Sequence, residues 1–540
     1  MKLRTLFPAL LAFLVLGSTV ACTDVGVDPK SSASASNIFK EDGSYRSYLA
    51  KLYGGLAVVG QATASETDIS AGVSDAGSQQ YMRLYWELQE LPTDEAVLAW
   101  EDQTIQDFNK MEWGDADVFN EAMYSRIYFQ VAQVNEFLRQ STDANLEDRG
   151  VSPEVQEKMS RWRAEARFLR ALSYWHALDL YRNVPLVTED FPRGAQPPEQ
   201  DSPQEIYNFV RDELQAITDS EGEENLLPAG EAEYGRADKG AAWTLLAKLY
   251  QNAPVYIGEN HSSEVVDVTA KIINSGAYSL EEDYQNLFLA DNHTADGMIF
   301  GIPQDGQTIQ TYGGTTFLGH ASVGGSLDAA QLGWNGGWFG LRTTPELVDL
   351  FDNQDQRPRF RFDGANTQFY QAGQQKEVNE LTQFSDGYLV PKYQNVNSDG
   401  SEASDPNFSD IDFPMFRLAD VYLMYAEAVA RGASNASGLN AVRLVNDLRE
   451  RAGLGRDVGT SNGPSLTPEF ILEERGRELF WEAHRRTDLI RFGQFTSNDK
   501  TWAWKGGVEN GTGVSSNLRL YPIPSSELNT NPNMTQNPGY

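Results

Sequence analysis

Side chains able to do catalytic or metal chemistry are few and scattered in this sequence. Its five histidines show no pair at metal-ligand spacing, and Cys22 is the single cysteine. There is no Gly-x-Ser-x-Gly turn, phosphate-binding loop or glycine-rich nucleotide fingerprint. A glycosidase-like pair can hide among the 77 carboxylates, because a sequence does not give the distance between them. These patterns predict no catalytic residue, no metal and no cofactor, and they leave a hidden carboxylate pair open.

Aromatic side chains in a glycine-rich stretch are better candidates for function. Gly301–Gly340 holds eleven glycines together with Tyr312, Trp334 and Trp338. Glycine favours loops, so these rings have no helical stripe to bury into and some should be exposed. An exposed ring suits the apolar CH face of a sugar, whose hydroxyl groups need polar neighbours. Polar side chains in the same stretch are His320, Gln331, Asn335 and Arg342. The alternative is that Trp334 and Trp338 only fill a junction between two parts of the molecule.

A second aromatic stretch, Ala64–Trp113, lies far away in the chain. Arg83 and Trp86 are its candidate ligand contacts. It also contains Tyr81, Tyr85, Trp100 and Trp113. The sequence therefore predicts a binding site with Arg83, Trp86, Tyr312, Trp334 and Trp338, contributed by two separate segments.

Helical patterns fill most of the remaining chain and must position these two segments. Apolar residues recur at helical spacing in a series of separate stretches. The expected helices of the first half are 43–59, 118–138, a helix from Ser152-Pro153 to about 182, 203–217 and 236–250. Several of these helices carry alanines one turn away from aromatic residues. Such small residues allow close packing of helix pairs, as in tetratricopeptide repeats.

Local signals fix several helix ends and turns. Ser152-Pro153 and Thr344-Pro345 each combine a capping hydroxyl with proline at the first helical position. Ser202 to Glu205 reads as a capping box, and Gly453 as a helix stop. Asp355 with Arg357 is expected to tie a turn.

The C-terminal segment Phe416–Tyr540 has the most distinctive amino-acid sequence of the chain. A helical stripe over 416–429 is followed by Val445–Leu454 and by a helix that is expected to run from Ile471 into the 485–491 segment. The Glu and Arg residues alternating over 473–478 are expected to form ordinary ion pairs on a helix surface. This segment, and Ala164–Val187, closely resemble the SusD/RagB family of nutrient-binding surface lipoproteins.

That resemblance covers nearly the whole chain after its N-terminus and implies the fold. It implies a mostly α protein, in which a tetratricopeptide-like right-handed helical superhelix packs against an irregular, loop-rich ligand-binding half. The expected parts are a helical region at 41–290, with a ligand-loop insertion at about 60–115, and a C-terminal SusD/RagB region at 291–540. Ligand contacts of the family come from loops in comparable places, so the resemblance supports the two segments and not individual residues.

The N-terminus reads as an export signal. Lys2 and Arg4 precede an apolar run from Leu6 to Leu16 that is too short to cross a bilayer. Cys22 then stands where a lipoprotein signal presents its thiol for acylation, for example with palmitate. We expect a signal peptide at 1–21 and a flexible, lipid-anchored Ser/Ala-rich tether at 22–40. A plain signal peptide with an incidental cysteine is the alternative.

The net charge of −34 argues against a nucleic-acid partner, because phosphates would be repelled. It argues equally against adhesion to anionic lipid headgroups.

The expected function is capture of an oligosaccharide, or less often a peptide, at the extracellular side of the outer membrane. By resemblance, the protein would deliver this ligand to a SusC-like TonB-dependent outer-membrane barrel, and it would not be an enzyme. The alternative is a helical protein-interaction scaffold of the outer membrane that binds no small ligand.

Overall fold

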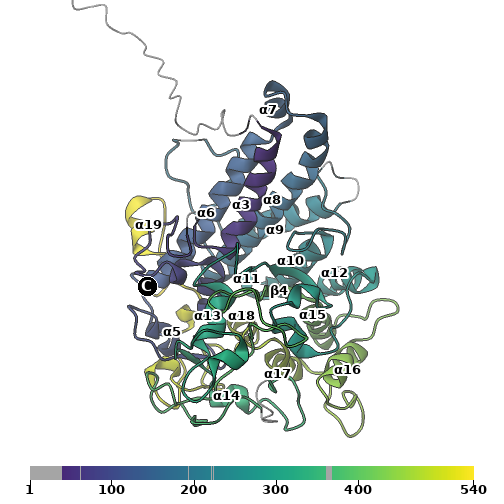
Figure 1. Ribbon diagram of the computed structural model, residues 1–540. Coiled ribbons are helices and arrows are strands. Elements are labelled where there is room, and N and C mark those ends of the chain that lie inside the picture. Colours follow the sequence, from purple (N-terminus) through teal and green to yellow (C-terminus); the bar gives the residue numbers. More distant parts are fainter. Residues whose placement is uncertain are drawn as a thin grey trace, which may run out of the picture.

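The computed structural model describes residues 39, 41–60, 63–192, 194–219, 222, 224–360 and 368–540. The predicted signal peptide, Cys22 and the tether up to residue 38 lie outside the described residues. Figure 1 shows a mostly helical molecule, and its element labels are used below. Among the described residues, no helix is long and apolar enough to span a membrane.

Six long helices build the first half. They are α3 (Asp42–Ala57), α6 (Val118–Gln140), α8 (Pro153–Leu180), α9 (Pro203–Thr218), α10 (Lys239–Gln251) and α12 (Ser262–Ser275). Short helices connect them: α4 (Tyr81–Glu90), α5 (Gln106–Lys110), α7 (Asp143–Asp148) and α11 (Ala253–Tyr256). From α6 to α12, each long helix packs on the next. Figure 1 shows α8 beside α9, and α3 in front between α6 and α8.

The second half mixes short elements with three further helices of the stack, α15 (Leu418–Ala430), α16 (Ala441–Arg451) and α17 (Pro468–Leu479). Its other helices are α13 (Gly314–Ala321), α14 (Pro345–Val348), α18 (Arg485–Arg491) and α19 (Ser525–Thr530). Helix α15 packs on α12 and on both α16 and α17, so the C-terminal helices continue the stack begun in the first half. The expected fold class, helix pairs of the tetratricopeptide type beside a loop-rich part, is confirmed. The division at residue 290 stays a prediction.

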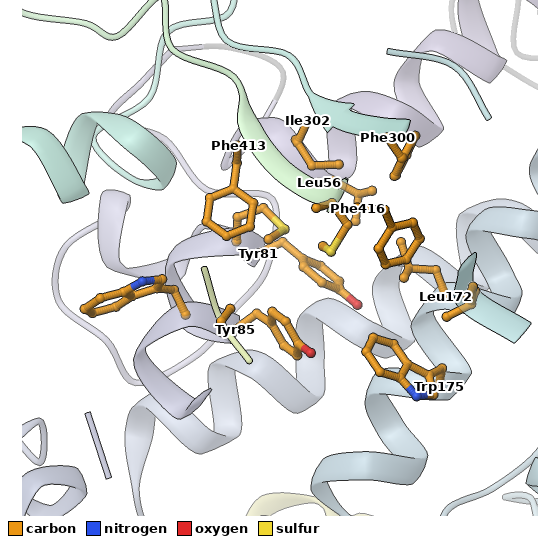
Figure 2. Close-up of a cluster of buried hydrophobic side chains, with 14 of the residues drawn as sticks. Leu56, Tyr81, Tyr85, Leu172, Trp175, Phe300, Ile302, Phe413 and Phe416 are labelled. Carbon is orange, nitrogen blue, oxygen red and sulfur yellow. The ribbon is translucent and has the colours of Figure 1, made fainter. Parts of the chain in front are cut away.

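Two small antiparallel ribbons connect distant parts of the chain. Strand β1 (Val97–Leu98) pairs with β3 (Leu341–Arg342), and β2 (Met298–Ile302) pairs with β4 (Phe413–Arg417). The β2–β4 ribbon lies on the helices through a cluster of buried aromatic and aliphatic side chains (Figure 2). Labelled members of this cluster are Leu56 of α3, Tyr81 and Tyr85 of α4, Leu172 and Trp175 of α8, and Phe300, Ile302, Phe413 and Phe416 of the ribbon. The loop-rich half is therefore fixed to the helical half by its core.

Most of the local helix signals are confirmed. The capping box at Ser202 forms in full, and the hydroxyl of Thr344 accepts a hydrogen bond from the backbone N–H of Leu347. Gly453 ends α16 with a φ of 78°. At α8, proline takes the first helical position as predicted, but the hydroxyl of Ser152 caps no backbone group of the helix. Helix α10 starts at Lys239, after the cap Asp238, and therefore later than expected.

Two expectations for the C-terminal helices are wrong. The helix predicted to run from Ile471 to Arg491 is two helices, because Trp481 and Ala483 adopt left-handed φ values of 62° and 63° between α17 and α18. The Glu–Arg alternation is not all on the surface either, because Glu474 and Glu478 are fully buried. Their charges are compensated inside the core, where the Arg357 guanidinium lies 2.7 Å from Glu474 and 3.1 Å from Glu478.

The predicted turn held by Asp355 and Arg357 is confirmed, and Arg357 has a further role in the core. Its Nη2 lies 2.6 Å from Oδ2 of Asp355, and both side chains are fully buried. The pair therefore links a turn to α17 instead of tying an exposed loop.

Candidate functional site

A groove of about 400 Å³ opens where the two aromatic segments meet. Its walls come from residues 73–83, from residues 100–105 after β1, and from α6. The glycine-rich stretch completes them with Tyr312 and Trp338. We call it the aromatic groove and define it by six of its lining residues: Asp75, Arg83, Trp100, Gln103, Tyr312 and Trp338.

The β1–β3 ribbon brings the two segments together. Leu98 pairs with Leu341, and the backbone N–H of Ala99 donates to the carbonyl of Gly340 at 2.9 Å. This antiparallel register continues toward Trp100 on one side and Trp338 on the other. The indole N–H of Trp100 then donates to the backbone carbonyl of Trp338 at 3.0 Å. Backbone pairing thus fixes the relative position of two rings that are 238 residues apart.

Glycines let the chain pass close to the rings. A Cβ at Gly340 would lie 2.8 Å from Cζ2 of Trp100, and a Cβ at Gly77 would lie 2.7 Å from Cβ of Tyr312. Both distances are too short for real contacts, so any larger residue would displace a ring of the groove. Glycine in both aromatic segments therefore serves close packing around the rings.

Three neighbouring rings line the groove, each tilted against the next. Trp338 is central, with ring centres 6.4 Å from those of both Trp100 and Tyr312 and with interplanar angles of 41° and 49°. All three side chains are partly exposed. Behind Trp338 the buried His320 ring stacks at 4.6 Å with an interplanar angle of 9°. Burial lowers the pKa of His320, while the backbone carbonyls of Gly336 and Asn407, which face its two ring nitrogens, act against this shift.

Arg83 lies at the floor of the groove, in a position that the protein holds tightly. Its Nε donates to Oε1 of Glu87 at 2.9 Å, and its guanidinium carbon lies 4.1 Å from the centre of the Phe317 ring. Its Nη1 lies 3.9 Å from Oδ2 of Asp75. Burial raises the pKa of Glu87, although Arg83 acts against this shift.

The rim carries polar groups close to the rings. Asp75 is exposed, and its carboxylate accepts hydrogen bonds from the N–H and the hydroxyl of Ser78 at 3.0 and 3.1 Å. Gln103 has a φ of 49°, and its amide donates to the carbonyl of Gly72 at 2.8 Å. One cation, two carboxylates (Asp75 and Asp102) and one amide lie beside the three rings, a set of polar groups that suits an uncharged, hydroxyl-rich ligand more than an anionic one.

The structure brings together three of the five predicted site residues. Arg83, Tyr312 and Trp338 line the aromatic groove. Trp86 and Trp334 do not, because both are enclosed, with exposed fractions of 0% and 1%.

The predictions for Trp86 and Trp334 are therefore wrong, each for a packing reason. Trp86 lies on α4, packs edge-on against Phe317 and Trp481, and donates its indole N–H to the carbonyl of Trp481 at 3.0 Å. Trp334 fills the space over Gly319, where a Cβ would lie only 2.0 Å from its ring. Trp334 is thus enclosed by Gly319 and His320 of its own glycine-rich stretch, and its role as a junction-filling side chain stays a prediction. The Trp338 ring, by contrast, lines the groove.

Sequence reasoning missed Trp100, Asp75 and Gln103. Trp86 lies within an apolar run at helical spacing, whereas Trp100 is followed by the acidic residues Glu101 and Asp102 and precedes no helical stripe. That contrast favours exposure of Trp100 and burial of Trp86, and it could have distinguished the two residues in the sequence. Of the polar candidates near the rings, His320 and Arg342 are buried, whereas Gln331 and Asn335 are exposed.

No chemistry beyond binding is indicated by this arrangement. Across the described part of the chain, no group of three His, Cys, Asp or Glu side chains is placed to hold a metal ion.

Comparison with known proteins identifies the family. The SusD family model matches residues 365–540. The starch-binding protein SusD of Bacteroides thetaiotaomicron is 33% identical, and the alignment covers 98% of both chains. The chain belongs to the SusD family. SusD-like protein P25 of Formosa agariphila is 28% identical over 68% of this chain and 70% of its own.

Solved SusD-family structures have the same fold. Surface glycan-binding protein A from Bacteroides fluxus superposes with a TM-score of 0.68 at 22% identity, covering 93% of this chain and all of that chain (100%). Surface glycan-binding protein A from Bacteroides thetaiotaomicron, solved with laminarihexaose, gives a TM-score of 0.67 at 20% identity and covers 92% and 99% of the two chains. The resemblance and the fold that the sequence predicted are thereby confirmed. These SusD-family relatives are described as binding proteins for glycans and not as enzymes.

Proposed function

We propose that this SusD-family protein captures an oligosaccharide in the aromatic groove and delivers it to a SusC-like TonB-dependent transporter. The observation that carries the proposal is the set of three neighbouring, partly exposed rings, Trp100, Trp338 and Tyr312, with polar side chains at the rim of the groove. Each ring offers an apolar face for a sugar, and Asp75, Gln103 and Arg83 offer hydrogen-bond partners for hydroxyl groups.

The tilt between neighbouring rings favours a curved glucan. Successive rings are tilted by 41° and 49°, so a straight, flat chain such as a β-1,4-glucan meets only one of them face to face. An α-1,4-glucan curves along its length and can follow all three rings. The 33% identical relative is a starch-binding protein, which supports the same ligand class.

Titration calorimetry with maltoheptaose, laminarihexaose and cellohexaose tests this ligand class. We expect maltoheptaose to bind, laminarihexaose to bind more weakly and cellohexaose not to bind measurably. Tighter binding of cellohexaose than of maltoheptaose would contradict the curvature argument. Binding of no glycan at all would favour the alternative, a helical interaction scaffold without a small ligand.

The anchor and the transporter are separate parts of the proposal. Cys22 is the proposed acylation site, so Cys22→Ser should abolish labelling by palmitate and release the protein from the outer membrane. Proteinase added to intact cells should digest the protein if it faces outward. A TonB-dependent barrel should copurify with the tagged protein, and failure to recover one after mild solubilisation would contradict delivery.

A further inference from the structure

A second cavity, of about 600 Å³, lies beside the C-terminal part of α3 and is lined by polar side chains that the aromatic groove does not use. We call it the amide pocket and define it by Lys51, Gly54, Phe129, Gln130, Gln133 and Gln310. These residues come from α3, α6 and the segment before Tyr312.

Two lining residues of the amide pocket lack an explanation within the protein itself. Phe129 of α6 is partly exposed and lies outside the hydrophobic core, and it makes no ring contact among the described residues. Gly54 costs helix stability in α3, yet a Cβ there would meet nothing within 4 Å. Its neighbour Gly55 is different, because a Cβ there would lie 2.2 Å from Oε1 of Gln130. An exposed ring and an open stretch of helix backbone thus face the same cavity.

Polar groups line the same pocket as that ring. The Lys51 ammonium lies 5.5 Å from the centre of the Tyr48 ring, and within the described residues no carboxylate is at ion-pair distance from it. Gln133 accepts a hydrogen bond from the Tyr48 hydroxyl at 2.9 Å, and Gln130 donates to the carbonyl of Leu52 at 2.7 Å. These contacts orient both amides on the pocket wall. The amide pocket thus combines one aromatic face with fixed amides and an ammonium group. The aromatic groove combines the same kinds of group, supplied by other residue types.

The amide pocket and the aromatic groove are neighbours. Gln310 lines the pocket and Tyr312 lines the groove, and two residues of extended chain span roughly 7 Å. Residues 63–79 also contribute to both cavities, and Arg126 of α6 holds the chain on either side at several points. The guanidinium of Arg126 donates to the carbonyls of Val59 and Gln79 and to the carboxylate of Asp68. One buried side chain therefore fixes the walls of both cavities relative to each other.

We infer that the amide pocket is a second carbohydrate subsite that takes further sugar units of the chain held in the aromatic groove. This inference rests on the proposed function and deepens it. Phe129 provides the apolar face, Gln133, Gln310 and Lys51 bind hydroxyl groups, and the bare backbone at Gly54 lets a sugar approach α3. A short oligosaccharide fills only the aromatic groove, whereas a long one occupies both sites.

Two substitutions in the full-length protein test the subsite by opposite means. Phe129→Ala removes the ring, and Gly54→Leu fills the pocket from α3. Gly43→Leu is the matched control, because Gly43 lies on the same helix, lines neither cavity and also has open space around it. Affinities for maltotriose and maltodecaose are measured by titration calorimetry, with thermal unfolding to confirm that each variant is folded.

We expect both pocket variants to weaken maltodecaose binding about tenfold, equivalent to about 1.4 kcal/mol, and to leave maltotriose binding unchanged. The control should match the wild type for both ligands. Unchanged maltodecaose binding in both pocket variants, or an equal loss for both ligands, would overturn the inference. Failure of the proposed function has a different signature, because the wild type would then bind neither ligand.

Discussion

Replacing Trp338 by alanine is the most direct test of the aromatic groove. The ring is partly exposed between Trp100 and Tyr312, and its other face rests on His320. The substitution keeps the backbone carbonyl that accepts the hydrogen bond from Trp100, so the β1–β3 connection should survive. Loss of the ring should therefore affect the ligand more than the fold.

The expected loss of affinity follows from the exposed face of the ring. A large aromatic side chain buries about 150–250 Å² when it is covered, so a sugar on one face of Trp338 removes on the order of 100 Å² from water. At about 25 cal/mol per Å² this contributes about 2.5 kcal/mol. The full contribution corresponds to about sixtyfold in affinity, and a shift of one neighbouring ring toward the sugar would reduce the loss. We therefore expect Trp338→Ala to weaken maltoheptaose binding about ten- to sixtyfold.

Calorimetric titration with maltoheptaose measures this loss, and Trp334→Ala is the control from the same loop. Trp334 is enclosed over Gly319, so its removal should lower the unfolding temperature and leave the affinity of the folded protein near that of the wild type. Wild-type affinity in Trp338→Ala, or a larger affinity loss in the folded control, would refute the assignment of the groove.

Three further predictions follow from packing and charge. Trp86→Ala should destabilise the fold by about 3–5 kcal/mol in chemical denaturation, because its ring is fully buried, and a change below about 1 kcal/mol would contradict this burial. Gly340→Ala should weaken glycan binding by displacing the Trp100 ring, whereas Gly336→Ala, with open space around its Cβ position, should not. Burial alone would raise the pKa of Glu474, but Arg357 and Arg477 lower it to about 2. Its ionised form therefore stabilises the fold above about pH 4.5, and this contribution is lost as the pH falls toward 2. Unfolding temperatures measured between these pH values should fall less steeply in Glu474→Gln than in the wild type, and parallel curves would contradict the assignment.

Sequence by itself determined most helical elements, the family and the two aromatic segments that line the groove. Helix ends at Ser202, Thr344 and Gly453 depend on residues within about four positions, and such local signals are readable without a structure. The concentration of glycine and aromatic residues in 301–340 likewise pointed to a loop-rich binding region before any contact was known.

Tertiary structure alone decided which rings face solvent and which charges are buried. Trp86 is enclosed by Trp481, whose carbonyl accepts its indole N–H across 395 residues of sequence, whereas Trp100 is placed at the groove by a strand pair with the glycine-rich loop. Glu474 belongs to the core because Arg357 reaches it from a distant turn. Exposure of a side chain is set by the elements that pack over it, and those elements come from parts of the chain too far apart for local patterns to connect.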